Sequence, residues 1–493
     1  MQLVIGITLA AAFLLVQVQA QPFINMSDDL FSSSLGFCTV IIFLCAYAFK
    51  NAALTGLASI QDKMSLEQRT LYVIDQGLLT AISFITVIGA IIVGGCIFVV
   101  QFLAEVARLK REALKDRRRR LRYVSTGKEV EVPALTDGEF HLFLSHVWGS
   151  GQDQMRVVKQ RLVEMLPTSK NFLDVDDLDE GKGAEFVDRS ATTLVFISTG
   201  YFTSPNCVRE LFRAVAFDRP LFSLMESEAG KGGLTREQVW ETLLENDASG
   251  FYAKCGLASE VDAWGVRLPS AQELYDALFK TEPIEWARIG SFQDVSMRLI
   301  ANHIVQKASS ETFLQGELSR NVPIIGLPSA LNAFHVFCSE ANEGAAALVQ
   351  EVSQTLSLKI SMTADLEQLP SCDGMLVYLT ARTWTSGHHS AEFADHVKLA
   401  MKGSVPLLLA HEMPSIDPED NARRHAVNFP AFFSCVEGTT PRELLSKGIY
   451  DQIAIALKDG PWRRASLVLV AHAIALQSQA GESSVNAMTE IMI

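Results

Sequence analysis

The chain has 493 residues, which is enough for two or three domains with hydrophobic cores of their own. Its 56 acidic residues outnumber its 42 basic residues, and the resulting net charge of −14 argues against a nucleic-acid binder, because phosphate backbones require a basic protein face. The eight cysteines form no Cys-x-x-Cys pair, so their spacing predicts neither a zinc site nor a disulfide framework.

Three apolar segments occupy the first hundred residues. Residues 1–20 fit either a signal peptide, cleaved after Val18-Gln-Ala20, or a first transmembrane helix. A second transmembrane helix is expected at 35–58. Residues 78–103 contain no charged side chain, and as a helix of about 39 Å they would cross the hydrocarbon core with some tilt. The sequence therefore predicts a membrane protein.

A basic segment follows the last apolar stretch, in what we interpret as a juxtamembrane linker over 104–135. The basic residues are Arg108, Lys110, Arg111, Lys115, Arg117, Arg118, Arg119, Arg120 and Arg122. Positive charge beside a span favours the cytoplasmic side and can also bind anionic lipid headgroups. Three spans with an external N-terminus agree with this topology and are preferred. A cleaved signal peptide followed by a single span at 78–103 agrees with it as well.

Three apolar, strand-like runs occur at 140–145, 171–175 and 193–198. A helical pattern lies between the first two, at 154–166, with apolar residues spaced for one helix face. Strand, helix, strand, short helix, strand is the order of a parallel α/β sheet with right-handed crossovers.

At these residues the chain resembles a Toll/interleukin-1 receptor (TIR) domain. The first run is similar to the family's first-strand motif, and Ser204-Pro-Asn-Cys207-Val-Arg-Glu210-Leu211 is similar to its Ser-x-x-Cys-x-x-Glu helix start. The family's long loop after the second strand corresponds to Asp176, Asp177, Leu178, Asp179, Glu180 and Gly181. The resemblance implies a flavodoxin-like, five-stranded parallel sheet in a domain at 136–310, with the fourth strand at 219–224, the fifth at 284–289 and a closing helix at 291–306.

A second, degenerate TIR-like domain is expected at 328–460. Phe334-His-Val-Phe-Cys-Ser339 matches Phe140-His-Leu-Phe-Leu-Ser145 at four of six positions. Residues 376–393 align without gaps on 194–211, and Glu392 takes the place of Glu210. Most of the acidic loop is missing from this copy, so no activity is assigned to it. Residues 461–493 are interpreted as a C-terminal tail.

Some TIR domains cleave NAD and release nicotinamide, whereas others associate with one another as signalling adaptors. If this chain is an enzyme, the resemblance makes Glu210 the catalytic carboxylate, NAD the substrate, and no cofactor or metal necessary. Nicotinamide is already a cationic leaving group, so one ionised carboxylate that stabilises the oxocarbenium ion would suffice. The alternative is a glutamate in the first turn of a helix, with only a small favourable interaction with the helix dipole.

The residues expected around such a ligand are Ser145, His146, Tyr201, Phe202 and Asn206. Many family members carry Trp where this chain has Asn206, which puts stacking of a substrate in doubt. Tyr201 and Phe202 would then be either a replacement aromatic surface or core residues. Ser204 is expected to cap the helix that holds Glu210, with Pro205 in its first turn, and Cys207 to pack inward.

The acidic loop at 176–181 is interpreted as a solvated segment that contacts partner domains, in preference to a magnesium or phospho-acceptor site. The predicted function is signal transduction by a membrane-anchored, multi-pass protein whose cytoplasmic TIR domain associates with identical or different TIR domains. Ala90-x-x-x-Gly94 offers a small-residue face for helix pairing. The alternatives are an NAD glycohydrolase that is activated by clustering and a purely structural tether.

Overall fold

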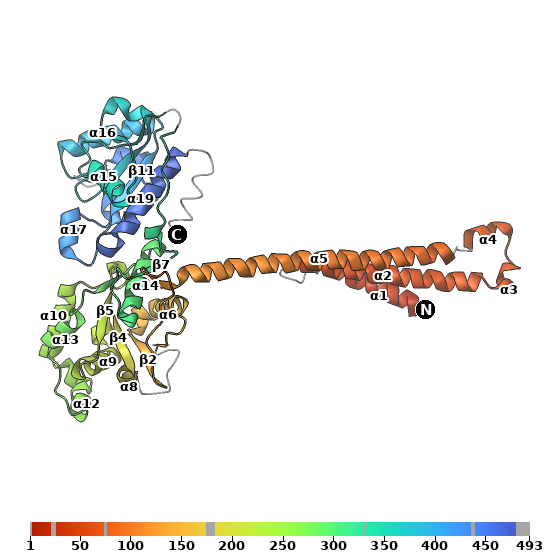
Figure 1. The fold of residues 1–493 in the computed structure, drawn as a ribbon, viewed down its shortest axis with the longest axis horizontal. Coiled ribbons are helices and arrows are strands. Elements are labelled where there is room, and N and C mark those ends of the chain that lie inside the picture. Colours follow the sequence, from red (N-terminus) through yellow and green to blue (C-terminus); the bar gives the residue numbers. More distant parts are fainter. Residues whose placement is uncertain are drawn as a thin grey trace. The chain divides into compact units, whose positions relative to one another are not determined.

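The structure is a computed structural model that describes residues 2–20, 26–72, 76–173, 183–329, 332–434 and 439–479. The chain divides into two compact units, Met1–Lys115 and Asp116–Ile493. Figure 1 shows the helical first unit in red to orange and the mixed second unit in orange to blue.

The first unit is entirely helical where it is described. Its helices are α1 (Gln2–Ala20), α2 (Met26–Thr55), α3 (Ala58–Gln61), α4 (Leu66–Tyr72) and most of α5 (Gln76–Arg119). Three of these segments, Gln2–Ala20, Phe31–Thr55 and Gly77–Arg119, are long and apolar enough to cross a membrane. Large apolar side chains such as Leu9 and Ile91 remain 66% and 68% exposed, as expected of helices that are apolar on all sides.

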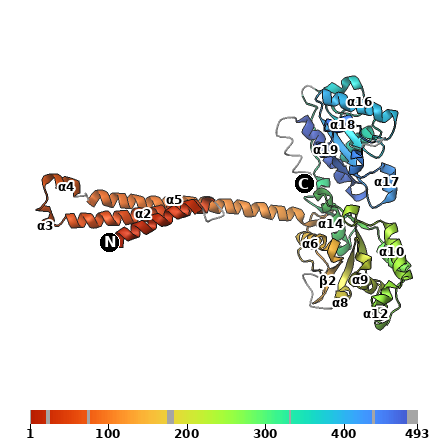
Figure 2. The same cartoon turned by 180° about the vertical axis from the view of Figure 1, so that it is seen from behind.

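Small residues allow these helices to approach one another within the first unit, and Figure 2 shows α1, α2 and α5 side by side. A Cβ atom added to Gly36 would lie 3.1 Å from Leu14, and one added to Gly94 would lie 3.5 Å from the ring of Phe31. Gly94, which was predicted to lie on a face for helix pairing, is next to α2 of its own chain.

Much of the segment 104–135, which was interpreted as a linker, forms regular secondary structure. Helix α5 continues through the basic residues to Arg119, and β1 (Leu121–Tyr123) then pairs antiparallel with β7 (Thr312–Leu314). Leu121 is fully buried. This ladder joins residues about 190 positions apart, a pairing that no local pattern predicts, and it extends the first domain of the second unit beyond the expected limits of 136 and 310.

The first domain contains a five-stranded sheet in which all strands are parallel. Its strands are β2 (Phe140–Ser145), β3 (Asn171–Phe172), β4 (Ser190–Ile197), β5 (Leu221–Glu226) and β6 (Ile284–Trp286). They lie in the spatial order β3-β2-β4-β5-β6, so the second strand in the chain is at one edge and the fifth at the other. The predicted α/β class and parallel sheet are confirmed.

Helices cover both faces of this sheet, as a parallel sheet requires. Alternate residues of β4 point to opposite faces: Leu194 and Phe196 pack against α6 (Trp148–Met165) and α14 (Gly290–Val305), while Val195 and Ile197 pack against the other layer. That layer holds α8 (Gly183–Asp188), α9 (Pro205–Ala216), α10 (Arg236–Ala248), α11 (Phe251–Lys254), α12 (Leu257–Ala263) and α13 (Ala271–Leu278).

The second domain repeats the strand order of the first. Its strands are β8 (Phe334–Phe337), β9 (Met362–Thr363), β10 (Cys372–Leu379), β11 (Leu407–Glu412) and β12 (Ile455–Leu457). They lie in the order β9-β8-β10-β11-β12, again all parallel. Its helices are α15 (Ala345–Leu356), α16 (His388–Lys402), α17 (Pro418–Arg424), α18 (Arg442–Ser446) and α19 (Arg463–Ser478).

Helix α19 corrects the prediction of a C-terminal tail at 461–493. It lies in the core of the second domain, where Leu467, Val468 and Val470 are at most 1% exposed. Together with α15 it covers one face of the second sheet, the role that α14 and α6 have in the first domain. Residues 480–493 lie outside the described part of the chain.

The two domains of the second unit share one apolar core. Phe292 and Val295 of α14 belong to the same buried cluster as Trp462 and Leu467. The indole Nε1 of Trp462 donates to the backbone carbonyl of Phe292 at 3.1 Å. Lys458, which follows β12, forms an ion pair with Glu285 of β6, and the two side chains are only 4% and 0% exposed. Burial of both apolar and charged groups therefore fixes the second domain against the first.

Helix α19 gives the first testable prediction. Leu467→Ala should destabilise the protein by about 2–5 kcal/mol, because a cavity replaces a fully buried side chain. The urea midpoint of the full chain in lipid nanodiscs, followed by tryptophan fluorescence, measures this loss. Leu399→Ala on α16 is the matched control, since Leu399 is 45% exposed. Equal effects of the two changes would contradict the assignment of α19 to the core.

Candidate functional site

Glu210 lies on α9, which follows β4 through a short 3-10 turn at Tyr201–Thr203. The helix is strongly amphipathic, and Glu210 is on its buried face beside Cys207 and Leu211. The glutamate is only 7% exposed. A carboxylate buried to this degree requires hydrogen-bond donors.

Ser145, the last residue of β2, supplies one such donor. Its Oγ donates to Glu210 Oε2 at 2.6 Å and lies 2.6 Å from the hydroxyl of Tyr201. Because Ser145 has one hydroxyl proton and gives it to Glu210, the Tyr201 hydroxyl donates to Ser145. The backbone carbonyl of Cys207, at 3.4 Å, is the other acceptor for the Tyr201 proton. The three side chains thus form a chain of hydrogen bonds that ends on the carboxylate.

Tyr201 is a neutral donor in this site. Burial raises the pKa of its phenol well above the ordinary value, and the nearby Cys207 and Glu210 raise it further, while the hydrogen bond with Ser145 lowers it in part. The side chain is fully buried. Tyr201 therefore keeps its proton throughout the physiological pH range.

The other residues that were predicted around the ligand lie in three different environments. His146 is 5% exposed, with Nδ1 3.1 Å from the carbonyl of Leu144. Phe202 is 2% exposed and packs edge-on against Tyr201, so both aromatic residues belong to the core and form no exposed surface. Asn206 lies on the surface, where its Oδ1 accepts a hydrogen bond from Arg209 at 2.7 Å. The structure brings together Ser145, Tyr201 and Glu210 and leaves Asn206 outside this cluster.

Two predictions concern the start of α9, where Ser204 was expected to cap the helix and Cys207 to pack inward. Ser204 occupies the N-cap position and Pro205 the first turn, but the Ser204 side chain makes no capping hydrogen bond, so that part of the prediction is wrong. Cys207 packs inward as predicted, at 3% exposure, and its Sγ donates to the carbonyl of His146 at 3.3 Å.

The cluster lies where the strand order of the first sheet reverses, between β2 and β4. Open α/β sheets bind ligands at this point, outside the carboxyl ends of the strands. Two further polar residues that were not predicted from the sequence lie here: Ser150 Oγ and Ser198 Oγ are 2.8 Å apart. Both are small polar residues that come soon after a strand, a signal that could have identified them.

The second domain does not reproduce the cluster. Glu392, the counterpart of Glu210, is 46% exposed and lies 3.9 Å from His388 Nδ1 on the same helix. Ser339, the counterpart of Ser145, is instead 2.8 Å from Nδ1 of His396. The carboxylate position is therefore kept in the sequence, while the side chain points out of the core.

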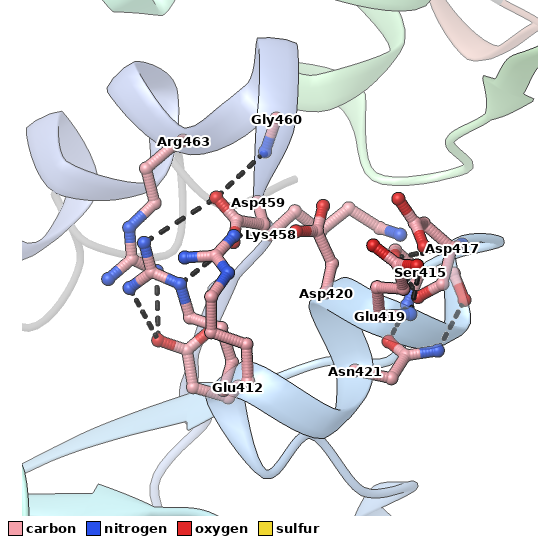
Figure 3. A network of polar contacts seen from close by, with 12 residues as sticks. Glu412, Ser415, Asp417, Glu419, Asp420, Asn421, Lys458, Asp459, Gly460 and Arg463 are labelled. Carbon is pink, nitrogen blue, oxygen red and sulfur yellow. Dashed lines mark hydrogen bonds and ion pairs between the residues drawn. The ribbon is translucent and has the colours of Figure 1, made fainter. Parts of the chain in front are cut away.

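A second polar network lies at the carboxyl edge of the second sheet, and sequence analysis missed it. Figure 3 shows Glu412, the last residue of β11, beside the guanidinium of Arg463. The Nη1 group of Arg463 donates to Glu412 Oε1 at 2.8 Å. Asp459, which follows β12, accepts from Arg424 at 2.8 Å. Burial raises the pKa of Glu412, and the neighbouring arginines counteract this effect. The first domain has an equivalent pair, Arg288 with Glu226 at the end of β5, at 2.6 Å.

The predicted interaction loop, Asp176 to Gly181, lies outside the described residues. Comparison with protein-family models finds none that matches this chain. Comparison with curated proteins also finds no match.

The buried phenol of Tyr201 predicts a pH dependence of stability. In the unfolded chain a tyrosine loses its proton near pH 10, whereas the folded-state pKa of Tyr201 lies well above that value. Folding therefore becomes less favourable as the pH rises above about 10, because only the unfolded state releases this proton. In Tyr201→Phe, the urea midpoint should fall less between about pH 9 and 11 than in the unaltered protein.

Ser145→Ala is the control for this measurement. It removes the hydrogen bond with Tyr201 but leaves the buried phenol, so it should lower stability by about 1–3 kcal/mol and keep the pH dependence. The same pH dependence in Tyr201→Phe as in Ser145→Ala would contradict the proposed environment of the phenol.

Proposed function

We propose that this protein is a membrane-anchored signalling protein whose first domain is TIR-like and acts by associating with other TIR domains. The strand order of its first sheet is the flavodoxin-like order, second, first, third, fourth, fifth, which is the order that the resemblance to TIR domains implies. The motif Ser204 to Leu211 lies on the helix after the third strand, as in that family.

The observation that favours association over catalysis is the state of Glu210. Its carboxylate accepts from Ser145, which in turn bonds with Tyr201, and only 7% of the residue is exposed. A nucleotide could reach this carboxylate only after Ser145 or α9 had moved. The surface residue Asn206 also provides no aromatic face for a nicotinamide ring.

We infer from the basic residues near the end of α5 that the second unit lies in the cytoplasm. Three helices of sufficient length and apolarity are available. An odd number of spans with an external N-terminus puts the basic residues near the end of α5 on the cytoplasmic side, where positive charge is favoured. Confinement to a membrane raises the local concentration of the cytoplasmic domains, which makes a weak association effective.

The second domain is best interpreted as a degenerate copy of the first. The strand orders agree, and in both domains the fourth strand ends in a buried glutamate that pairs with an arginine, Glu226 with Arg288 and Glu412 with Arg463. Because Glu392 is exposed, we assign no NAD-cleaving activity to this copy.

Association predicts that the acidic loop is necessary for contact between copies. Replacing Asp176, Asp177 and Asp179 by Asn and Glu180 by Gln should weaken self-association at least about fivefold, since each rim ion pair contributes a few tenths of a kcal/mol or more. Energy transfer between differently labelled full chains in liposomes measures this change.

A matched control removes the same number of charges elsewhere on the first domain. Glu237, Glu241, Glu245 and Asp247 lie exposed on α10. Their replacement by Gln and Asn should leave association unchanged. An equal loss in both variants would show a general effect of charge and would overturn the role of the loop.

Cleavage of NAD is the second candidate function, and the place of Glu210 favours it. The carboxylate lies beside Ser145 at the reversal point of the strand order, where α/β sheets bind ligands. If α9 shifted on clustering, the same carboxylate would face that crevice and could stabilise an oxocarbenium ion.

The two functions differ in the release of nicotinamide by full chains that are densely reconstituted in liposomes. Association alone predicts that the unaltered protein releases no more nicotinamide than Glu210→Gln, which keeps the hydrogen bond from Ser145 but loses the charge. Release that falls about 100-fold or more in Glu210→Gln, and not in the control Glu392→Gln, would establish the second candidate.

A further inference from the structure

A cavity of about 560 Å³ lies between the two domains of the second unit. The first domain contributes 282–285 at the start of β6 and part of α14, and the second contributes 415–417, Asp420 and 459–462. The volume is typical of sites for small molecules. The cavity is separate from the cluster around Glu210, whose residues do not line it.

The position of the cavity in the second domain favours a ligand site. Residues 415–420 follow β11 and residues 459–462 follow β12, so the cavity lies at the carboxyl ends of two neighbouring parallel strands. Open α/β sheets bind their ligands at this edge. Here α14 of the other domain closes the site.

Two residues that line the cavity are buried, and each has one side-chain atom without a hydrogen-bond partner among the described residues. Glu285 is fully buried, and although its Oε1 accepts from Lys458, its Oε2 has no partner. Asn302 is 5% exposed; its Oδ1 accepts from Thr312 at 2.5 Å, whereas its Nδ2 donates to no described atom. Both unpaired atoms are fully buried, so they lie behind the cavity wall, and the choice of ligand depends on the groups that reach the cavity.

The rest of the lining combines an apolar wall with negative charge. Ile284, Leu299, Ile416, Pro461 and Trp462 form the apolar wall. The indole of Trp462 is held in place by its hydrogen bond to Phe292. His303 stacks on Phe222 with ring centroids 4.1 Å apart, and burial lowers its pKa, so the imidazole is neutral at pH 7.

Carboxylates dominate the charged part of the lining. They are Glu282, Glu285, Asp417, Asp420 and Asp459, against a single lysine, Lys307. Four of these carboxylates pair with a basic side chain. Asp417 forms no ion pair within the described residues, and its side chain accepts only the backbone N–H of Glu419. Figure 3 shows Asp417 beside Ser415, apart from the guanidinium groups around Glu412.

The carboxylate of Asp417, which forms no ion pair within the described residues, favours a cationic ligand, and the rest of the lining favours an organic one. In the described part of the chain, no three His, Cys, Asp or Glu side chains are arranged to hold a metal ion. An apolar wall also suits a ligand with a hydrocarbon body better than a bare ion.

We propose that the cavity binds a small organic cation, a primary amine on a compact apolar or aromatic body. The ammonium group pairs with Asp417, and the body packs on Ile416 and Trp462. Because both domains line the site, a bound ligand stabilises the packing of one domain against the other. This stabilisation increases with the fraction of sites that are occupied. This site is independent of the proposed association through the first domain.

Tyramine is the probe, because it carries an ammonium group, an aromatic body and a hydroxyl. Calorimetry with the full chain in nanodiscs should show saturable binding with a Kd of about 1 mM or tighter. The neutral 4-ethylphenol and the anionic 3-(4-hydroxyphenyl)propionate share the ring and hydroxyl, and they should bind at least about tenfold more weakly. Equal binding of the anion, or no saturable binding of tyramine, would overturn the proposal.

Three variants locate the binding. Asp417→Asn removes the charge but can still accept from the N–H of Glu419, and it should raise the Kd for tyramine about tenfold. Glu419→Gln makes the same charge change two residues away, outside the lining, and should leave the Kd unchanged. Ile416→Trp fills the cavity and should abolish binding. Tyramine that binds Asp417→Asn as well as the unaltered protein occupies another site, which would refute the assignment.

Discussion

The need to cover both faces of a parallel sheet is the constraint on which the second unit depends. Parallel strands are joined by crossovers that place helices on both faces, and a face left open would expose a continuous apolar surface. In the first domain α6 and α14 cover one face, and in the second domain α15 and α19 do so. The outer side of α14 then packs on the second domain through Phe292 and Val295. The two sheets thus form one folded body, in which the closing helix of the first domain also belongs to the core of the second.

Buried charge makes this arrangement specific. Apolar packing alone tolerates several alternative contacts, whereas a desolvated ion pair such as Lys458 with Glu285 requires both partners to be in place. The pairs Glu226 with Arg288 and Glu412 with Arg463 each lie within one domain and fix the carboxyl ends of its strands. Loss of Lys458 or Glu285 would leave an uncompensated buried charge, so this pair limits how far the domains can move against each other. The cavity between the domains is bounded by one of these pairs.

The carboxyl edges of the two sheets have diverged in a way that matters for function. In the first domain the edge holds a buried carboxylate that is engaged by Ser145 and Tyr201. In the second domain the equivalent Glu392 faces outward, while an arginine-rich network and the acidic lining of the cavity occupy other parts of the edge. The same fold therefore has a buried polar cluster in the first domain and a charged, accessible cavity beside the second domain. This difference is the basis of the two roles that we propose, association through the first domain and ligand binding in the cavity beside the second.

The sequence by itself determined the features that depend on local pattern. Periodicity and composition predict the apolar segments near the N-terminus, the alternation within β2 and β4, and the order of strands and helices. They do so because the spacing of apolar residues along the chain reflects which side chains are buried. Even the repeat was detectable, from Phe334 to Ser339. Tertiary structure alone decided the pairing of β1 with β7, the burial of α19, the outward position of Glu392 and the contact of Glu285 with Lys458. Each of these joins residues far apart in the chain or depends on which face of a helix meets the sheet, and no local pattern carries that information.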